Sequence, residues 1–118
     1  MYRSHFEIAY NQIVDDVTIR VLYRDDSLVM TELVIQRRAV LPDHVHQSDH
    51  SAYLLQGKIH VVADDITSKF VQGDSWCMKK NICHRTLAIE DSVVLEVFNP
   101  EGEIEGFKAR QRDKTIEF

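Results

Sequence analysis

Apolar and polar residues alternate along most of the chain in short stretches, and turn-forming residues separate these stretches. A period of two is typical of strands with one buried face, and few segments show the spacing of an amphipathic helix. The predicted strands are Val17 to Tyr23, Leu28 to Gln36, a strand beginning at Val40 and Leu41, Ser51 to Gln56, Lys58 to Ala63, Ile66 to Val71, Trp76 to Met78, His84 to Ile89 and Ser92 to Asn99. Many short strands without intervening helices predict an all-β sandwich or barrel.

The two ends of the chain are less regular. Residues 1–14 are compatible with a strand or a short helix, and residues 101–118 form a strongly charged tail. A length of 118 residues fits one domain of ordinary size. We therefore expect a single domain over residues 1–118.

Composition narrows the class of protein. Apolar residues make up 44% and charged residues 28% of the chain, as in soluble globular proteins, and the net charge of −5 argues against a nucleic-acid partner. Met1 to Tyr10 carries charges where a secretory signal needs an apolar segment, and no apolar run approaches the ~18 residues of a membrane span. We expect a cytoplasmic protein with no membrane partner. Cys77 and Cys83 form no disulfide framework and are interpreted as packing residues.

Four of the six histidines stand where they can converge. His44 and His46 are two apart in an extended segment, so their rings point to one face, ~6–7 Å apart along the chain. Rings at that separation can share one metal at ~2 Å from each nitrogen. His50 follows a polar turn, and His84 comes from a distant strand. A closed barrel would bring all four to one centre.

The alternative is that these histidines are ordinary surface residues, as we expect for the isolated His5 and His60. Two longer patterns favour a site. His44-Val45-His46, three residues, His50, six residues and Gly57 form the first; Gly73 followed after ten residues by His84 forms the second. This spacing resembles the two motifs of the cupin family, over roughly residues 28–100.

The resemblance implies a cupin barrel, a double-stranded β-helix or jelly roll of the RmlC-like kind. It also implies one divalent metal bound by His44, His46, His50 and His84. The chain departs from the motifs at several positions. Arg38 and Asn81 replace usual glycines, Lys79 replaces a proline, Ala88 replaces an asparagine, and His50 replaces the usual glutamate ligand. Histidine or glutamine at this last position is similar to small cupins that act on sugars and other organic acids.

Four neutral imidazoles determine which metals fit. Such a site suits zinc, nickel, iron(II), manganese or copper, whereas magnesium and calcium prefer oxygen ligands. Because no ligand carboxylate offsets the charge of the cation, we expect a small anionic substrate.

The last predicted strand, Ser92 to Asn99, is apolar from Val93 to Phe98 except for Glu96. A carboxylate in an apolar run costs free energy unless it is paired or functional. Glu96 is either a general acid/base beside the metal or an outward residue paired with an Arg or Lys, and both alternatives stay open. Phe98 shares its face, and Gln56 has the inward parity of its own strand, so we expect both to contact substrate. Trp76 either packs in the core or lines the mouth of the barrel, and we expect the core.

Residues 90–100 resemble the end of small cupins of pectin and alginate breakdown, which linearise unsaturated uronates. This resemblance implies a metal-dependent lyase or isomerase acting on a small anionic or sugar-derived substrate, with Glu96 as its catalytic carboxylate. An iron-dependent dioxygenase and a non-catalytic metal- or ligand-binding module are the alternatives. Resemblance to small cupins also implies a homodimer.

Overall fold

The structure, a computed structural model, describes residues 10–100. The charged tail and residues 1–9 lie outside the described residues. The strands are β1 (Asn11–Val14), β2 (Val17–Arg24), β3 (Val29–Ile35), β4 (Val40–His44), β5 (His50–Gln56), β6 (Lys58–Ala63), β7 (Ile66–Val71), β8 (Ser75–Met78), β9 (His84–Ala88) and β10 (Ser92–Phe98). Every predicted strand is present, with slightly different ends. Within residues 10–100, no helix has the length and apolar character that a membrane span requires.

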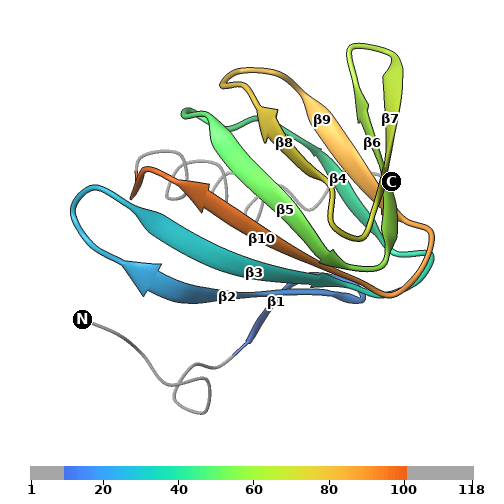
Figure 1. Ribbon diagram of the computed structural model, residues 1–118, viewed down its shortest axis with the longest axis horizontal. Helices are drawn as coiled ribbons and strands as arrows, with labels where there is room; N and C mark the ends of the chain where they lie inside the picture. The colour runs from blue at the N-terminus through green and yellow to red at the C-terminus, as the bar shows by residue number, and fades with distance from the viewer. Residues whose placement is uncertain (1–9, 101–118) are drawn as a thin grey trace.

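The strands form two antiparallel sheets that face each other (Figure 1). One sheet has the order β1-β2-β3-β10-β5-β8, and the other has the order β4-β9-β6-β7. β10 therefore lies between β3 and β5, far from both in sequence, and β9 lies between β4 and β6. This arrangement confirms the predicted all-β barrel.

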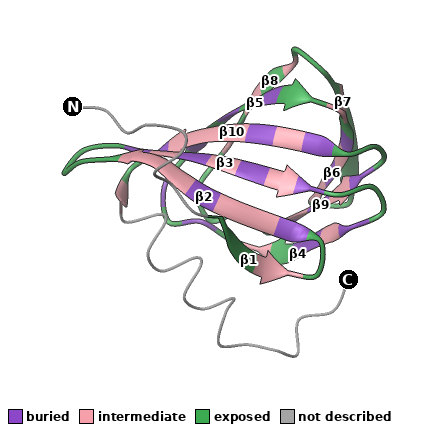
Figure 2. Ribbon diagram, turned by 90° about the horizontal axis from the view of Figure 1, so that it is seen from below, coloured by how far each residue is buried: buried purple, intermediate pink, exposed green. Residues whose placement is uncertain are grey.

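The core lies between the two sheets because alternate residues of each strand point inward. In β3, Val29, Thr31, Leu33 and Ile35 are buried, and the residues between them are partly exposed. Figure 2 shows the same alternation as bands along β3 and the first part of β10. Along β5 the alternation ends at Leu55 and Gln56, which are both exposed.

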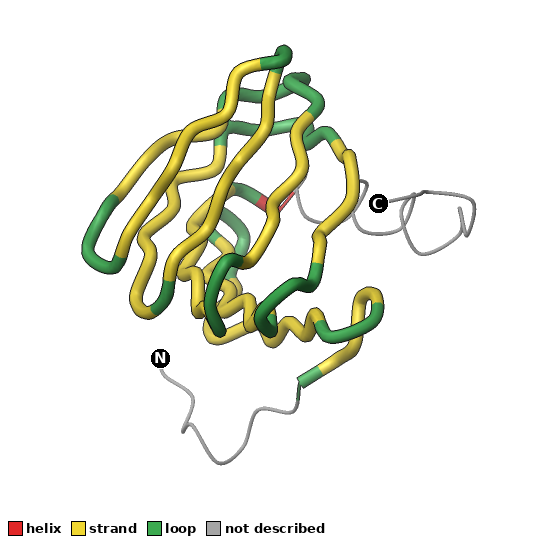
Figure 3. Tube along the Cα trace, turned by 90° about the vertical axis from the view of Figure 1, so that its right-hand side faces the viewer, coloured by secondary structure: helices red, strands yellow, loops and turns green. Residues whose placement is uncertain are grey.

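Short loops join the strands at both ends of the barrel (Figure 3), and several depend on a left-handed residue. Gly57 and Gly73 have φ values of 98° and 95°, which glycine adopts without steric cost. Arg38 and Asn81, which replace two motif glycines, have φ values of 74° and 64°. The backbone at both positions thus keeps the conformation that a glycine favours, although the side chain has changed.

The two cysteines do not pack in the core, so the sequence-based interpretation is wrong for both. Cys77 and Cys83 are exposed free thiols. Cys77 lies on β8 between Trp76 and Met78, which are partly buried and pack against the core. Strand parity therefore directs the Cys77 thiol to the outer surface.

Candidate metal centre

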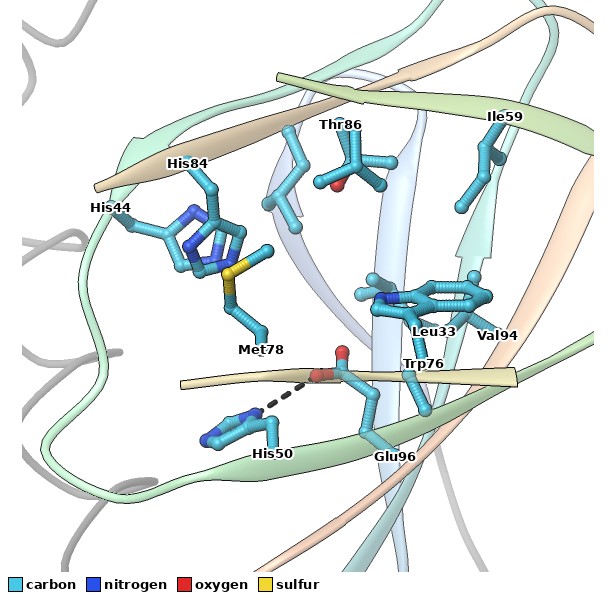
Figure 4. A pocket seen from close by; sticks show the side chains of 13 residues that line it. Leu33, His44, His50, Ile59, Trp76, Met78, His84, Thr86, Val94 and Glu96 are labelled. Carbon is cyan, nitrogen blue, oxygen red and sulfur yellow. Dashed lines mark hydrogen bonds and ion pairs between the residues drawn. The ribbon is translucent and has the colours of Figure 1, made fainter. Parts of the chain in front are cut away.

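His44 and His84 face each other across two paired strands. His44 is the last residue of β4, His84 is the first residue of β9, and the two are register partners in the antiparallel pair. Their ring centroids are 4.0 Å apart. Figure 4 shows both rings at the same end of the cavity inside the barrel. Residues 40 positions apart in sequence are thus brought into contact by sheet pairing.

The loop that follows β4 carries His46 and then returns the chain to His50, the first residue of β5. The ring centroid of His46 lies 4.6 Å from that of His44 and 5.0 Å from that of His84. It also stacks on the ring of His50 at 3.6 Å. All four predicted histidines therefore meet at one end of the barrel.

The possible ligand atoms fall into two overlapping sets. One set is His44, His46 and His84, and the other is His46, His50 and Glu96; within each set the ligand atoms lie within 4.8 Å of one another. His46 belongs to both sets. The described residues therefore include a histidine-rich cluster that could hold a metal ion.

Hydrogen bonds orient two of the rings. Nδ1 of His44 donates to the carbonyl oxygen of Pro42 at 2.8 Å, and Nδ1 of His84 donates to that of Ile82 at 2.9 Å. Because a carbonyl oxygen can only accept, each Nδ1 carries the proton and each Nε2 keeps its lone pair. Metal-binding histidines are commonly fixed by a partner of this kind.

His50 is fixed by two different neighbours. Its Nδ1 lies 2.9 Å from Oε2 of Glu96, and the ring of Phe98 stacks on its own at 3.9 Å with an interplanar angle of 2°. His50 is 1% exposed, and its Nε2 is buried without a hydrogen-bond partner among the described residues. A buried unsatisfied nitrogen typically costs about 1–3 kcal/mol, and a metal ion would satisfy it. The residues present therefore fit a transition metal.

Burial keeps two of the histidines, His46 and His84, in the neutral form that binds a metal. Burial, and then the proximity of His50 and His84, lowers the pKa of His46 to about 2. Burial also lowers the pKa of His84, although the carbonyl of Ile82 and the carboxylate of Glu96 oppose the shift. Both rings are therefore neutral near pH 7, as ligand imidazoles must be.

A small cavity adjoins the histidines inside the barrel. It offers about 30 Å³ to water-sized molecules. Its walls are Leu33, Leu41, His44, His50, Ala52, Ile59, Val61, Trp76, Met78, His84, Thr86, Val94 and Glu96. Figure 4 shows one carboxylate oxygen of Glu96 hydrogen-bonded to His50 and the other directed into the cavity. Of the two alternatives for Glu96, the structure has the inward orientation.

The two residues expected to contact substrate lie elsewhere. Phe98 is 3% exposed and packs on His50, so it supports a histidine and does not line the cavity. Gln56 is at the opposite end of β5 from His50, about 20 Å along the strand. It is exposed, so the inward position expected from parity is wrong. The reason is a register shift between Val93 and Val94, which interrupts the alternation opposite Gln56.

Sequence reasoning overlooked Met78 and Thr86, which line the cavity beside Trp76. Trp76 and Met78 share the inward face of β8, and Thr86 lies two residues beyond His84 on β9. The signal was available for both, because parity places Met78 on the face of Trp76 and Thr86 on the face of His84. Trp76 packs against the core as expected, and it also forms a wall of the cavity.

Comparisons with known proteins agree with this geometry. No family model matches the chain. A pectin degradation protein, KdgF of Dickeya dadantii (strain 3937), is 25% identical over 97 residues, which are 80% of this chain and 88% of that protein. Among solved structures, KdgF from Halomonas sp. is similar with a TM-score of 0.78 and 21% identity, over 87% of this chain and 96% of that chain.

An RmlC-like cupin from Shewanella frigidimarina NCIMB 400 is similar to the same degree. Its TM-score is 0.78 with 18% identity, over 86% of this chain and 92% of that chain. At such identities the likeness establishes the fold. Two facing antiparallel sheets, the histidine cluster between them and these structural neighbours lead to one conclusion: the protein has the fold of the cupin superfamily.

Proposed function

We propose that the protein is a metal-dependent enzyme that acts on a small organic anion as a lyase or isomerase. One divalent transition metal (zinc, nickel, iron or manganese) would be held by His44, His46, His50 and His84. The observation that carries the proposal is the state of the ring nitrogens. Nδ1 is hydrogen-bonded to an oxygen acceptor in His44, His50 and His84. Nε2 of His50 is buried without a hydrogen-bond partner among the described residues.

Glu96 has two tasks in this proposal. Its Oε2 accepts a hydrogen bond from His50 and orients that ring, while its other oxygen faces the cavity and moves a proton to or from the substrate. A bound metal would supply Lewis acidity toward a carbonyl or hydroxyl oxygen of the substrate. With only imidazole ligands, the full charge of the cation remains to attract an anion.

Sugar acids are the first substrates to test, since a curated relative is a pectin degradation protein. A panel of small organic anions, with unsaturated and saturated uronates and aromatic carboxylates, should include at least one compound that the metal-loaded protein converts. Oxygen consumption by iron-loaded protein would instead favour a dioxygenase. Absence of any turnover would leave a metal-binding module.

The metal site is tested by elemental composition. Wild type should retain a transition metal after purification, and the double variant His44→Ala/His84→Ala should lose it. His60→Ala is the matched control, because His60 lies on β6 outside the cluster. Equal metal content in wild type and the double variant would contradict the site.

The catalytic carboxylate is tested by Glu96→Gln. The amide oxygen of glutamine can still accept the hydrogen bond from His50, but the amide cannot take up a proton. Metal content should therefore persist while turnover of the converted substrate is lost. Unchanged turnover would remove the proposed role of Glu96.

The homodimer, the cytoplasmic location and the single domain over residues 1–118 are further proposals. Tyr53 and Leu55 support the homodimer, since both project from the outer face of β5 and are 42% and 46% exposed. Sedimentation of the full chain should give twice the monomer mass, and a monomer would contradict the expectation.

A further inference from the structure

We propose that an apolar hollow between β7 and β8 is the outer half of the substrate site. It would bind the flat, apolar part of a ligand whose oxygen-donor end reaches the histidine cluster. The inference rests on the proposed function and narrows its substrate class. It predicts a preference for an aromatic or similarly flat carboxylate over a sugar acid.

The inner cavity is too small to hold an organic substrate alone. Its space of about 30 Å³ matches roughly two water molecules. The neighbouring hollow offers about 300 Å³, ten times as much. Val61, Trp76 and Met78 line both spaces, so a single wall of side chains separates them.

This wall stands where the barrel is open. β7 is an edge strand of one sheet and β8 is an edge strand of the other, and each pairs with one neighbour only among the described strands. No ladder of backbone hydrogen bonds therefore closes the barrel between them. The Met78 side chain has three rotatable bonds, so it can move aside without disturbing either sheet.

The lining of the hollow selects the ligand class. Phe70 and Trp76 stack at 4.1 Å with an interplanar angle of 9°, which gives the hollow a flat aromatic wall. Ile66, 66% exposed, adds an apolar side chain at its rim. Among described residues the polar lining is Asp64, Ser68 and Cys77.

The charges that line the hollow also favour a ligand with an apolar ring and a single anionic group. The described lining residues of the hollow include no lysine, arginine or histidine, and Asp64 would repel a second carboxylate. Several sugar hydroxyls would lose hydrogen bonds to water against these apolar walls, which is unfavourable. One anionic group at the histidines and an apolar ring in the hollow satisfy both halves of the site.

Trp76 provides the test, because it is the chain's one tryptophan. Zinc-loaded wild type is titrated with benzoate and, separately, with galacturonate, and binding is followed by tryptophan fluorescence and by calorimetry. Benzoate should bind saturably, change the fluorescence and bind about tenfold more tightly than galacturonate. Equal affinities, or tighter binding of galacturonate, would overturn the inference.

A pair of variants on β7 locates the bound ring. Ser68→Phe fills the hollow, whereas Thr67→Phe places the same side chain on the opposite face of the strand. Ser68→Phe should weaken benzoate binding about tenfold with metal content unchanged, and Thr67→Phe should not. If both variants bind benzoate as wild type does, the hollow is not the binding site. If wild type does not retain zinc, the proposed metal site is wrong, whatever the hollow binds. A failure of the proposed function is therefore distinguishable from a failure of this inference.

Discussion

His50 shows how much of the proposed site depends on the surroundings of a single residue. Nδ1 of the His50 ring donates a hydrogen bond to Glu96. Phe98 and His46 stack on the two faces of the same ring. The ring is thereby held with Nε2 directed away from Glu96, in the tautomer that a metal requires. His50 is thus held in place by three neighbouring side chains.

Removing that support should weaken metal binding. Glu96→Ala deletes the acceptor for His50 Nδ1, and loss of such a partner typically lowers metal affinity about 10–100-fold. Glu96→Gln keeps an acceptor and should remain close to wild type. Zinc affinity is measured by competition with a chelating indicator. Glu32→Ala is the control, since Glu32 pairs with Arg20 away from the histidines. Wild-type affinity in Glu96→Ala would contradict the positioning role.

Arg38 allows a second prediction at the scale of one residue. A left-handed non-glycine residue costs about 1–2 kcal/mol, whereas the added flexibility of glycine costs about 0.5–1 kcal/mol. Because Arg38 has a φ of 74° and is exposed, Arg38→Gly should raise the free energy of unfolding by about 0.5–1 kcal/mol. Urea denaturation measures the change. Arg37→Gly, at an exposed neighbour without a positive φ, should give no gain; a gain in both variants would refute the explanation.

Sequence reasoning reached some of these residues and not others, for physical reasons. The motif spacing that resembles the cupin family selected His44 and His84, and the two are register partners at the ends of β4 and β9. Parity also restricted Glu96 to one face. It could not identify His50 as its partner, since that contact joins two strands 46 positions apart.

At the scale of strands and turns, the backbone has least room for an added side chain where two turns pack against each other. Gly57, between β5 and β6, lies against the turn between β9 and β10. A Cβ at Gly57 would lie 2.3 Å from Oγ of Ser92 and 2.4 Å from the carbonyl oxygen of Asp91. Oγ of Ser92 in turn accepts a hydrogen bond from the backbone of Lys58 and donates one to Glu90. The side chain and backbone at 91–92 therefore have little freedom to move.

Gly57→Ala should consequently destabilise the protein more than Gly73→Ala. Both residues have a positive φ, so each substitution carries the left-handed cost of about 1–2 kcal/mol. A Cβ at Gly73 meets nothing within 4 Å, so overpacking adds about 1–3 kcal/mol only at Gly57. Urea denaturation of both variants gives the difference. Equal losses would mean that the close approach to Ser92 is not limiting.

Strand positions were predictable from sequence, whereas strand order was not. Period two identifies each strand locally, but the placement of β10 between β3 and β5 arises from contacts between distant segments. The register shift beside Val93 has the same origin, and it moved Gln56 out of the inward face. The hollow between β7 and β8 likewise requires knowing which strands end each sheet.

At the scale of the whole molecule, the buried histidines couple stability to pH. His46 and His84 are neutral in the folded protein because their pKa values are lowered, but in the unfolded chain they protonate near pH 6.5. Below that pH the unfolded state binds more protons than the folded state, so stability falls as the pH falls. With a folded pKa of about 2, His46 continues to lower stability throughout the mildly acidic range.

Metal-free protein should therefore lose about 1 kcal/mol of stability between pH 6.5 and 5.5 from His46 alone. His84 adds to the loss, and carboxylates contribute little there because they titrate at about pH 4. Urea midpoints of chelator-treated protein measure the slope, and His46→Asn should reduce it. A flat profile would contradict the lowered pKa values. The stability of metal-loaded protein should fall more steeply with pH. A metal that binds only the folded state adds stability, and protons remove this gain because they compete with the metal for the same nitrogens.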